Sequence, residues 1–250
     1  MSTCVSSFTR FLPALAALGP LLLGACSAPE TRLGPETPSV SAASQPPAIA
    51  ATPEPASVMP AVGTAAALLE PVSKTQGLPA DYVPPDLTEL AGVPATRPGL
   101  RVRSAAYAPL KRMLADSQAA GLAIMVLSSY RSYDEQAAIF AEYARRTSEE
   151  QANRFSARPG QSEHQLGTTV DLTSPNVSYD LVEVFEQTPE GRWLRENAFR
   201  YGFVMSYPRE KEAITGYAYE PWHFRYVGEF AAGEVQRRGI TLQEYLAGRS

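Results

Sequence analysis

Two histidines, His164 and His223, are the residues of this 250-residue chain whose type and surroundings could do chemistry. His164 lies in the segment SEHQLGTTVD (residues 162–171), and His223 lies in the segment YEPWHFRYVG (residues 219–228). Neither segment has the glycine pattern of a phosphate-binding loop or of a nucleophile elbow. Histidines with carboxylates close by are instead the donor types that hold a metal ion.

A catalytic zinc site takes about three protein ligands from His, Asp or Glu and keeps a fourth position open. His164, Asp171 and His223 meet that count. Gly167 can adopt backbone angles closed to other residues, so the chain can turn there and bring Asp171 back beside His164. His223 would arrive from a distant strand, in which Trp222 and His223 point to opposite faces.

Glu220 precedes His223 by three residues and is separated from it by Pro221, so its carboxylate can stand near a metal without binding it. Such a carboxylate can take a proton from a zinc-activated water and later pass it to a leaving amine. The arrangement differs from the helical His-Glu-x-x-His pattern, so that protease class is not indicated. The residues alone leave open whether the histidines bind a metal or are packed, hydrogen-bonded core residues, and they specify no substrate.

The N-terminal residues predict an export signal, with a basic residue at Arg10 and an apolar stretch over 11–23 that is too short for a typical membrane span. The sequence LGAC at residues 23–26 resembles the lipobox of bacterial lipoproteins. We therefore expect a signal peptide over 1–25 and a lipid on Cys26 that anchors the protein to a membrane of the cell envelope. An ordinary secretory signal, in which Cys26 has no role, is the alternative.

Residues 26–76 are dominated by Ala, Pro, Ser, Thr and Val, and their prolines break helices and strands, which predicts a disordered tether. The chain's two cysteines, Cys4 and Cys26, both precede the expected folded part. No structural disulfide is therefore expected, and a metal must be held by nitrogen and oxygen. The formal net charge is −4 without a dense basic run, which argues against nucleic acid as a partner.

The elements that position the candidate site are expected within one domain over residues 77–250. Ser132 and Glu135 form a capping-box signature that opens a helix, and a loop is expected from the end of that helix to Gly160. The other predicted helices cover 106–121, 188–202, 228–238 and 241–246, and the predicted strands cover 122–127, 170–172, 203–205 and 222–227. Because helices and strands do not alternate regularly, we expect an α+β fold with a small antiparallel sheet flanked by helices.

Three ordered motifs resemble those of the VanY-type zinc D-Ala-D-Ala carboxypeptidases, including LdcB-like relatives that trim tetrapeptide stems. The motifs are SSYRS (128–132), SEHQxGxxxD (162–171) and EPWHFRYVG (220–228), and the resemblance extends over about residues 79–246. It implies the zinc DD-peptidase (hedgehog-like) fold and one Zn²⁺ per chain. It also implies that His164, Asp171 and His223 bind the zinc and that Glu220 is the general base and acid.

The resemblance further assigns Arg131, whose guanidinium would polarise the scissile carbonyl or neutralise the oxyanion. The alternative for Arg131 is an ordinary surface position at a helix N-terminus. Further residues are expected to line the substrate cleft or to bind substrate with Arg131: Gln136, Ser162, Glu163, Tyr207 and Trp222.

The activity implied by the resemblance is removal of the terminal D-Ala from peptidoglycan stem peptides. We also expect the protein to be a monomer. Three alternatives stay open: an L,D-carboxypeptidase acting on tetrapeptide stems, an endopeptidase that opens cross-links, and a wall-binding module without turnover. The presence of both Glu220 and Arg131 argues against the last, because a binding module needs neither a base nor an oxyanion partner.

Overall fold

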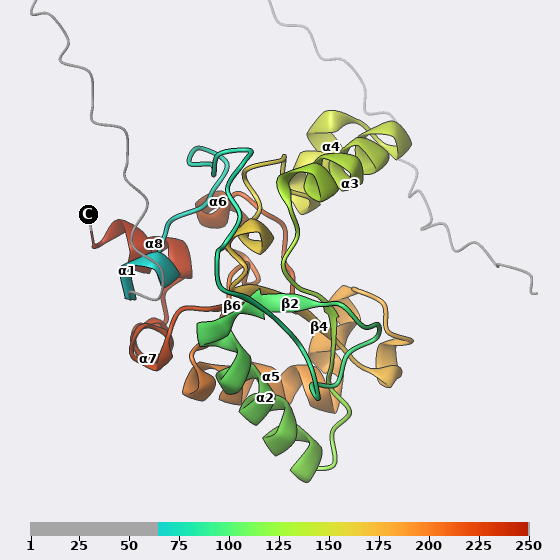
Figure 1. The fold of residues 1–250 in the computed structure, drawn as a ribbon, viewed down its shortest axis with the longest axis vertical. Coiled ribbons are helices and arrows are strands. Elements are labelled where there is room, and N and C mark those ends of the chain that lie inside the picture. The colour runs from blue at the N-terminus through green and yellow to red at the C-terminus, as the bar shows by residue number, and fades with distance from the viewer. Residues whose placement is uncertain (1–64, 250) are drawn as a thin grey trace, which may run out of the picture. The chain divides into compact units, whose positions relative to one another are not determined.

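The computed structural model describes residues 65–249 (Figure 1). The expected signal peptide, Cys26 and the expected tether up to residue 64 lie outside the described residues. No helix of the described part is long and apolar enough to cross a membrane.

A four-stranded antiparallel sheet is the centre of the fold, with strand order β3-β4-β6-β5. Its strands are β3 (Met125–Ser128), β4 (Thr169–Thr173), β5 (Phe203–Met205) and β6 (His223–Tyr226). A separate two-stranded antiparallel sheet consists of β1 (Leu87–Glu89) and β2 (Arg101–Arg103). The expected α+β class with a small antiparallel sheet is confirmed, although β1 and β2 were not predicted.

Helices and 3₁₀ turns surround the strands (Figure 1). The helices are α1 (Ala65–Leu68), α2 (Ser104–Ala119), α3 (Tyr133–Arg146), α4 (Glu149–Phe155), α5 (Pro189–Asn197), α6 (Glu212–Thr215), α7 (Glu229–Arg238) and α8 (Leu242–Ala247). The 3₁₀ turns are η1 (Glu163–Leu166), η2 (Pro175–Val177), η3 (Glu183–Gln187) and η4 (Ala198–Tyr201).

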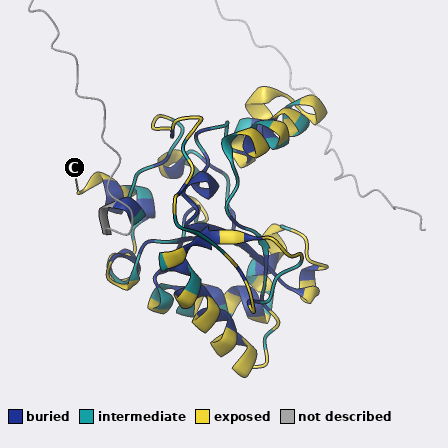
Figure 2. Cartoon of the chain, in the orientation of Figure 1, coloured by how far each residue is buried: buried dark blue, intermediate teal, exposed yellow. Residues whose placement is uncertain are grey.

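Side-chain alternation along the strands separates the core from the candidate site. Val170, Leu172 and Phe224 belong to the main hydrophobic core, together with side chains of α2 and α5. Since neighbouring residues of a strand face opposite sides, Asp171 and His223 lie on the other face of the sheet. Figure 2 shows the centre of the molecule buried and the outer faces of α2, α3 and α4 exposed. One face of the sheet therefore packs in the apolar core, and the other, which is also buried, carries the polar side chains of the candidate site.

The capping signals of the sequence mark real helix ends. The Ser132 hydroxyl accepts a hydrogen bond from the Glu135 amide at 3.2 Å, and the Glu135 carboxylate accepts one from the Ser132 amide at 2.8 Å. Gly121, expected to end the preceding helix, has φ +80° just beyond α2. Both helices thus confirm the sequence prediction, since local hydrogen bonding and backbone freedom decide where a helix begins and ends.

Several boundaries differ from the prediction. The strand expected over 122–127 begins three residues later, and the helix expected over 188–202 continues as the 3₁₀ turn η4 after α5. The expected loop before Gly160 is wrong in part because it contains α4, which Ser148 caps and which packs against α3 through Phe155. Seven residues are too few for a clear apolar period, so α4 depends on this packing.

Residues 65–76, expected to belong to the tether, form α1 and an ordered continuation in the structure. Val72 in this stretch is buried in a small cluster with Leu78 and Leu166. The packed part of the chain therefore extends N-terminal to the expected domain boundary at residue 77.

Candidate metal centre and active site

The register of the sheet brings two candidate ligands face to face. Asp171 of β4 pairs directly with His223 of β6, and Ser128 of β3 pairs with Asp171 on its other side. Residues paired across antiparallel strands lie on the same face, so this row forms the floor of the site. His164 joins from η1, and Gly167 after it has φ +72°, as the sequence predicted for the turn into β4.

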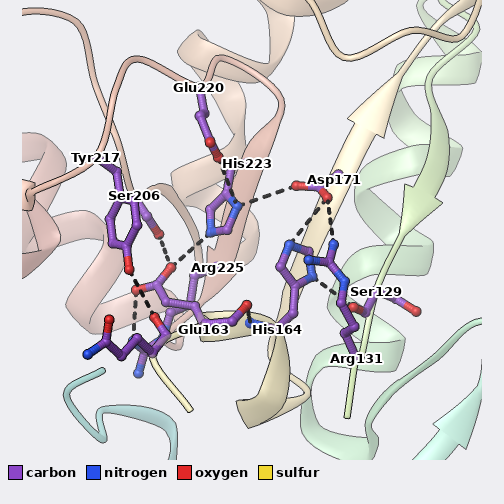
Figure 3. Close-up of polar contacts among 12 residues, drawn as sticks. Ser129, Arg131, Glu163, His164, Asp171, Ser206, Tyr217, Glu220, His223 and Arg225 are labelled. Carbon is purple, nitrogen blue, oxygen red and sulfur yellow. Dashed lines mark hydrogen bonds and ion pairs between the residues drawn. The ribbon is translucent and has the colours of Figure 1, made fainter. Parts of the chain in front are cut away.

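The candidate ligand atoms of His164, Asp171 and His223 all lie within 4.8 Å of one another, and the three residues are buried. His164 Nε2 is 3.2 Å from Asp171 Oδ2, and His223 Nδ1 is 3.4 Å from Asp171 Oδ1 (Figure 3). The Oδ1 atom of Asp171 is buried without a hydrogen-bond partner among the described residues. A carboxylate that lies between two imidazole nitrogens and has such an orphaned oxygen fits a cation site.

Each histidine has its second ring nitrogen bound by another group, which turns the first toward the centre. His164 Nδ1 is 2.7 Å from the Ser129 carbonyl oxygen, and His223 Nε2 is 3.0 Å from Glu163 Oε2. Donation from these nitrogens turns the other nitrogen of each ring toward the centre, where it can bind a metal once it carries no proton. With nitrogen and oxygen donors in a buried trio, the residues fit zinc.

Glu163 lies behind His223 and does not line the cleft, so the expectation that it faces substrate is not met. Its carboxylate forms an ion pair with Arg225 at 3.0 Å and accepts a hydrogen bond from the Ser206 hydroxyl at 2.6 Å. Burial raises the pKa of Glu163, but Arg225 and the hydrogen bonds from His223 and Ser206 outweigh it and hold the pKa at about 2. Glu163 is therefore an ionised acceptor that orients His223.

Glu220 stands at the edge of the trio, with its carboxylate oxygen 3.4 Å from His223 Nδ1. Burial raises the pKa of Glu220 to about 8, against the lowering effect of His223. A bound dication would lower this pKa again. The carboxylate is thus placed as the sequence predicted, beside the ligands and able to take or give a proton near neutral pH.

Arg131 reaches the site from the position before Ser132, the residue that caps α3. Its guanidinium donates to the Gln136 side-chain oxygen at 2.6 Å and to the Ser128 hydroxyl at 3.0 Å, and it lies 3.7 Å from Asp171. Gln136 also donates to the Ala157 carbonyl at 2.6 Å and is buried. Gln136 therefore holds Arg131 in place.

The site opens into a cleft of about 260 Å³. Of the expected substrate-binding residues, Arg131, Ser162 and Tyr207 line this cleft, whereas Gln136 and Trp222 do not. Trp222 instead packs against the main core, on the opposite face from His223. The remaining lining residues are Ile139, Tyr143, Phe155, Ser156, Ala157, His164, Asp171, Leu181, Tyr217, Glu220 and His223.

Sequence reasoning missed several contributors to the site. The Ser129 group that orients His164 is a backbone carbonyl, which leaves no signal in residue type. Arg225 could have been found, because it follows His223 by two residues in a strand and must share its face. Tyr143 and Phe155 face each other edge to face from α3 and α4, and the unpredicted α4 kept this wall of the cleft hidden.

A buried trio of two histidines and an aspartate, flanked by a proton-transfer carboxylate and a guanidinium, has the layout of a zinc peptidase site. Comparisons with known proteins agree. Residues 99–229 match the VanY family, described as D-alanyl-D-alanine carboxypeptidase. The chain is 38% identical over 185 residues to the putative carboxypeptidase YodJ of Bacillus subtilis (strain 168), which covers 71% of this chain and 66% of YodJ.

Solved structures show the same relationship. The structure of the LdcB LD-carboxypeptidase matches with a TM-score of 0.66 and 39% identity, covering 70% of this chain and 84% of that chain. A mutant of the vancomycin-resistance D,D-pentapeptidase VanY in complex with Zn(II) matches with a TM-score of 0.59 and 34% identity, covering 72% of this chain and 99% of that chain. The chain belongs to the VanY family of D-alanyl-D-alanine carboxypeptidases.

Proposed function

We propose that this protein is a zinc-dependent carboxypeptidase that removes the terminal D-Ala from peptidoglycan stem peptides. The observation that carries the proposal is the convergence of His164, Asp171 and His223 at the floor of the cleft, with Glu220 and Arg131 beside them. Family membership over residues 99–229 supports the kind of peptide bond, and the similar VanY structure in complex with Zn(II) supports the cofactor.

A zinc ion held by the trio supplies Lewis acidity and lowers the pKa of water. Glu220 accepts a proton from the attacking water and returns it to the amine of the leaving D-Ala. Arg131, fixed by Gln136 and Ser128, faces the carbonyl oxygen where negative charge develops in the transition state. Burial of the floor limits access of bulk water and strengthens these charge interactions.

Removal of D-Ala from tetrapeptide stems, an L,D-carboxypeptidase activity, is the second candidate. It is favoured by the LdcB LD-carboxypeptidase, whose match has a higher TM-score and identity than the match to VanY. Both reactions use the same zinc and proton-transfer groups, so the choice between them depends on how the cleft holds the residue before the scissile bond.

Incubation of the full-length protein with purified muropeptides, followed by mass spectrometry, tests both candidates. We expect loss of one D-Ala from pentapeptide stems; loss from tetrapeptide stems alone would assign the second candidate. Opening of cross-linked dimers would identify an endopeptidase, and unchanged muropeptides with zinc-loaded protein would contradict a catalytic role.

The proposal also includes attachment to a membrane of the cell envelope through a lipid on Cys26. The catalytic domain would then lie on the side of the membrane that carries the cell wall. The lipid attachment is supported by the sequence LGAC at residues 23–26 after an apolar stretch. A peptidoglycan substrate lies outside the cytoplasm, which agrees with an export signal.

A further inference from the structure

The stretch 65–78, which we call the entry segment, begins with α1, which lies beside α8 (Figure 1), and its Leu69 packs against the cluster that contains Leu242 and Leu246 of α8. Its Val72 and Leu78 form a buried cluster with Leu166, the last residue of the turn η1 that carries His164. The entry segment comprises the last twelve residues of the expected tether, 65–76, and the first two residues of the expected domain. In the chain it therefore connects residues 26–64 of the expected tether to the domain that carries the candidate zinc ligands.

Arg225 links the backbone of the entry segment to a zinc ligand. Its Nη2 donates to the Leu68 carbonyl at 3.0 Å and to the Glu70 carbonyl at 2.6 Å, while its Nη1 donates to Glu163 at 3.0 Å. Glu163 in turn accepts the hydrogen bond from His223. Arg225, Glu163 and His223 are all buried, so a continuous line of bonds away from solvent joins residues 68–70 to the metal centre.

A second line of contacts reaches the same histidine. Lys74 donates from Nζ to the Asn153 carbonyl at 2.6 Å and lies 4.6 Å from the ring centroid of Tyr217. The rings of Tyr217 and Tyr207 are 4.8 Å apart, and those of Tyr207 and His223 are 4.6 Å apart. Two parts of the entry segment, residues 68–70 and Lys74, are thus connected to His223 through separate series of contacts.

Detachment of the entry segment would remove both backbone acceptors of Arg225 Nη2. A buried guanidinium without these partners is costly, and Glu163 would lose the fixed counterion that holds it against His223. Conversely, a metal held by His223 would fix its ring, and through Glu163 the fixed ring would hold Arg225 in the position that binds the entry segment. By thermodynamic reciprocity, each event must favour the other to the same extent.

We infer that the entry segment is a positioning element of the zinc site, so that its docking and zinc binding stabilise each other. Arg225 and Glu163 transmit this coupling and act through His223. The inference rests on the proposed zinc site. It means that the chain segment leading into the domain contributes to zinc affinity.

Trypsin provides a local probe, because Lys74 is the only Lys or Arg between Arg32 and Arg97. In the full-length protein we expect the Lys74–Thr75 bond to be cut about 5-fold faster or more after zinc is removed than with zinc bound. Cleavage after the exposed Arg238 at the end of α7 is the internal control and should not change. Equal rates at Lys74 in both states, or an equal rise at Arg238, would overturn the inference.

The reverse experiment perturbs the entry segment and measures zinc. Val72→Asp places a charge in the buried cluster, whereas Val83→Asp makes the same change at an exposed position. In competition with a chromogenic chelator, we expect Val72→Asp to weaken zinc binding about 10-fold or more and Val83→Asp to leave it unchanged. If Val72→Asp lacks the native circular dichroism spectrum, Lys74→Met takes its place, with a smaller loss of affinity expected.

The two experiments separate the inference from the proposed function. A parent protein that binds no zinc would refute the zinc centre itself. Tight zinc binding by the parent, with the same Kd in a folded Val72→Asp variant or, in its place, Lys74→Met, would overturn the inference and leave the zinc centre intact.

Discussion

At the scale of single residues, the hydrogen bonds of each side chain decide which of its atoms can bind a metal. The second nitrogens of His164 and His223 are bound by Ser129 and Glu163, so the nitrogens that face the centre are left for a metal. Burial raises the pKa of Glu220 to about 8, although His223, 3.4 Å away, and Arg131 act to lower it. His164, His223 and Glu220 are all buried in one cleft, and their partners distinguish the two ligands from the base.

Glu220→Gln should abolish proton transfer while keeping the shape of the side chain. We expect kcat to fall about 10²-fold to 10⁴-fold, with zinc content equal to that of the parent. Steady-state kinetics on pentapeptide together with metal analysis would measure both. Glu212→Gln, at a more exposed glutamate paired with Arg154, is the matched control and should keep the parent's kcat. Parent-like turnover by Glu220→Gln would contradict the role of base.

Gln136→Leu should disturb catalysis through Arg131, whose guanidinium loses its 2.6 Å acceptor. We expect kcat to fall about 10-fold to 100-fold with zinc content unchanged. Gln136→Glu keeps an acceptor for Arg131 but not the donor to Ala157, so it should recover most of kcat and lose stability. Equal kcat in the parent and Gln136→Leu would show that Arg131 needs no such support.

At the scale of elements, the link between η1 and β4 decides whether the first two ligands meet. Gly167 turns the chain with φ +72°, and a Cβ there would lie 3.0 Å from both Arg103 Cγ and Leu87 Cδ2. The small sheet that contains Leu87 and Arg103 thus closes tightly over this turn. An element absent from the sequence prediction therefore limits which residue can stand between His164 and Asp171.

Gly167→Ala should be more damaging than the same substitution at another glycine of similar backbone angle. Gly99 has φ +76° but open space around its Cβ position, so Gly99→Ala should cost only about 1–2 kcal/mol of unfolding free energy for the backbone conformation. Gly167→Ala should cost more and also weaken zinc binding. Urea denaturation and zinc competition would measure these effects; equal losses in both variants would disprove the close packing at Gly167.

At the scale of the whole molecule, the buried charges couple folding to pH. The folded-state pKa of Glu163, about 2, lies below its ordinary value of 4.5. Its contribution to stability is therefore complete above about pH 4.5 and is lost as the pH falls from 4.5 toward 2. In metal-depleted protein, we expect Glu163→Gln to be less stable at neutral pH and to lose less stability over that range. Parallel curves for parent and variant would contradict this assignment.

Membrane attachment is also a property of the whole chain. Cys26→Ser removes the acceptor of the proposed lipid, and we expect the protein to move from the membrane fraction to the soluble fraction after cell lysis. Cys4→Ser, which lies within the expected signal peptide, is the control and should leave the protein with the membranes. Unchanged fractionation of Cys26→Ser would remove the proposed anchor.

The sequence by itself determined the features that depend on local chemistry. The capping box at Ser132, the turn at Gly167 and the alternation that turns Trp222 away from His223 each follow from a few neighbouring residues, and the structure has all three. Histidine scarcity and motif order were also enough to select the three candidate ligands.

Only the tertiary structure decided how distant residues share the site. Gln136 holds Arg131, and Glu163 orients His223. Arg225 links Glu163 to the backbone of residues 68–70. Strand register and the packing of the entry segment bring these residues together. On composition alone, residues 68–70 were assigned to the tether, because their burial depends on surfaces formed by distant parts of the chain. Local pattern names a candidate group, whereas its partners are set by long-range packing that no short window of sequence contains.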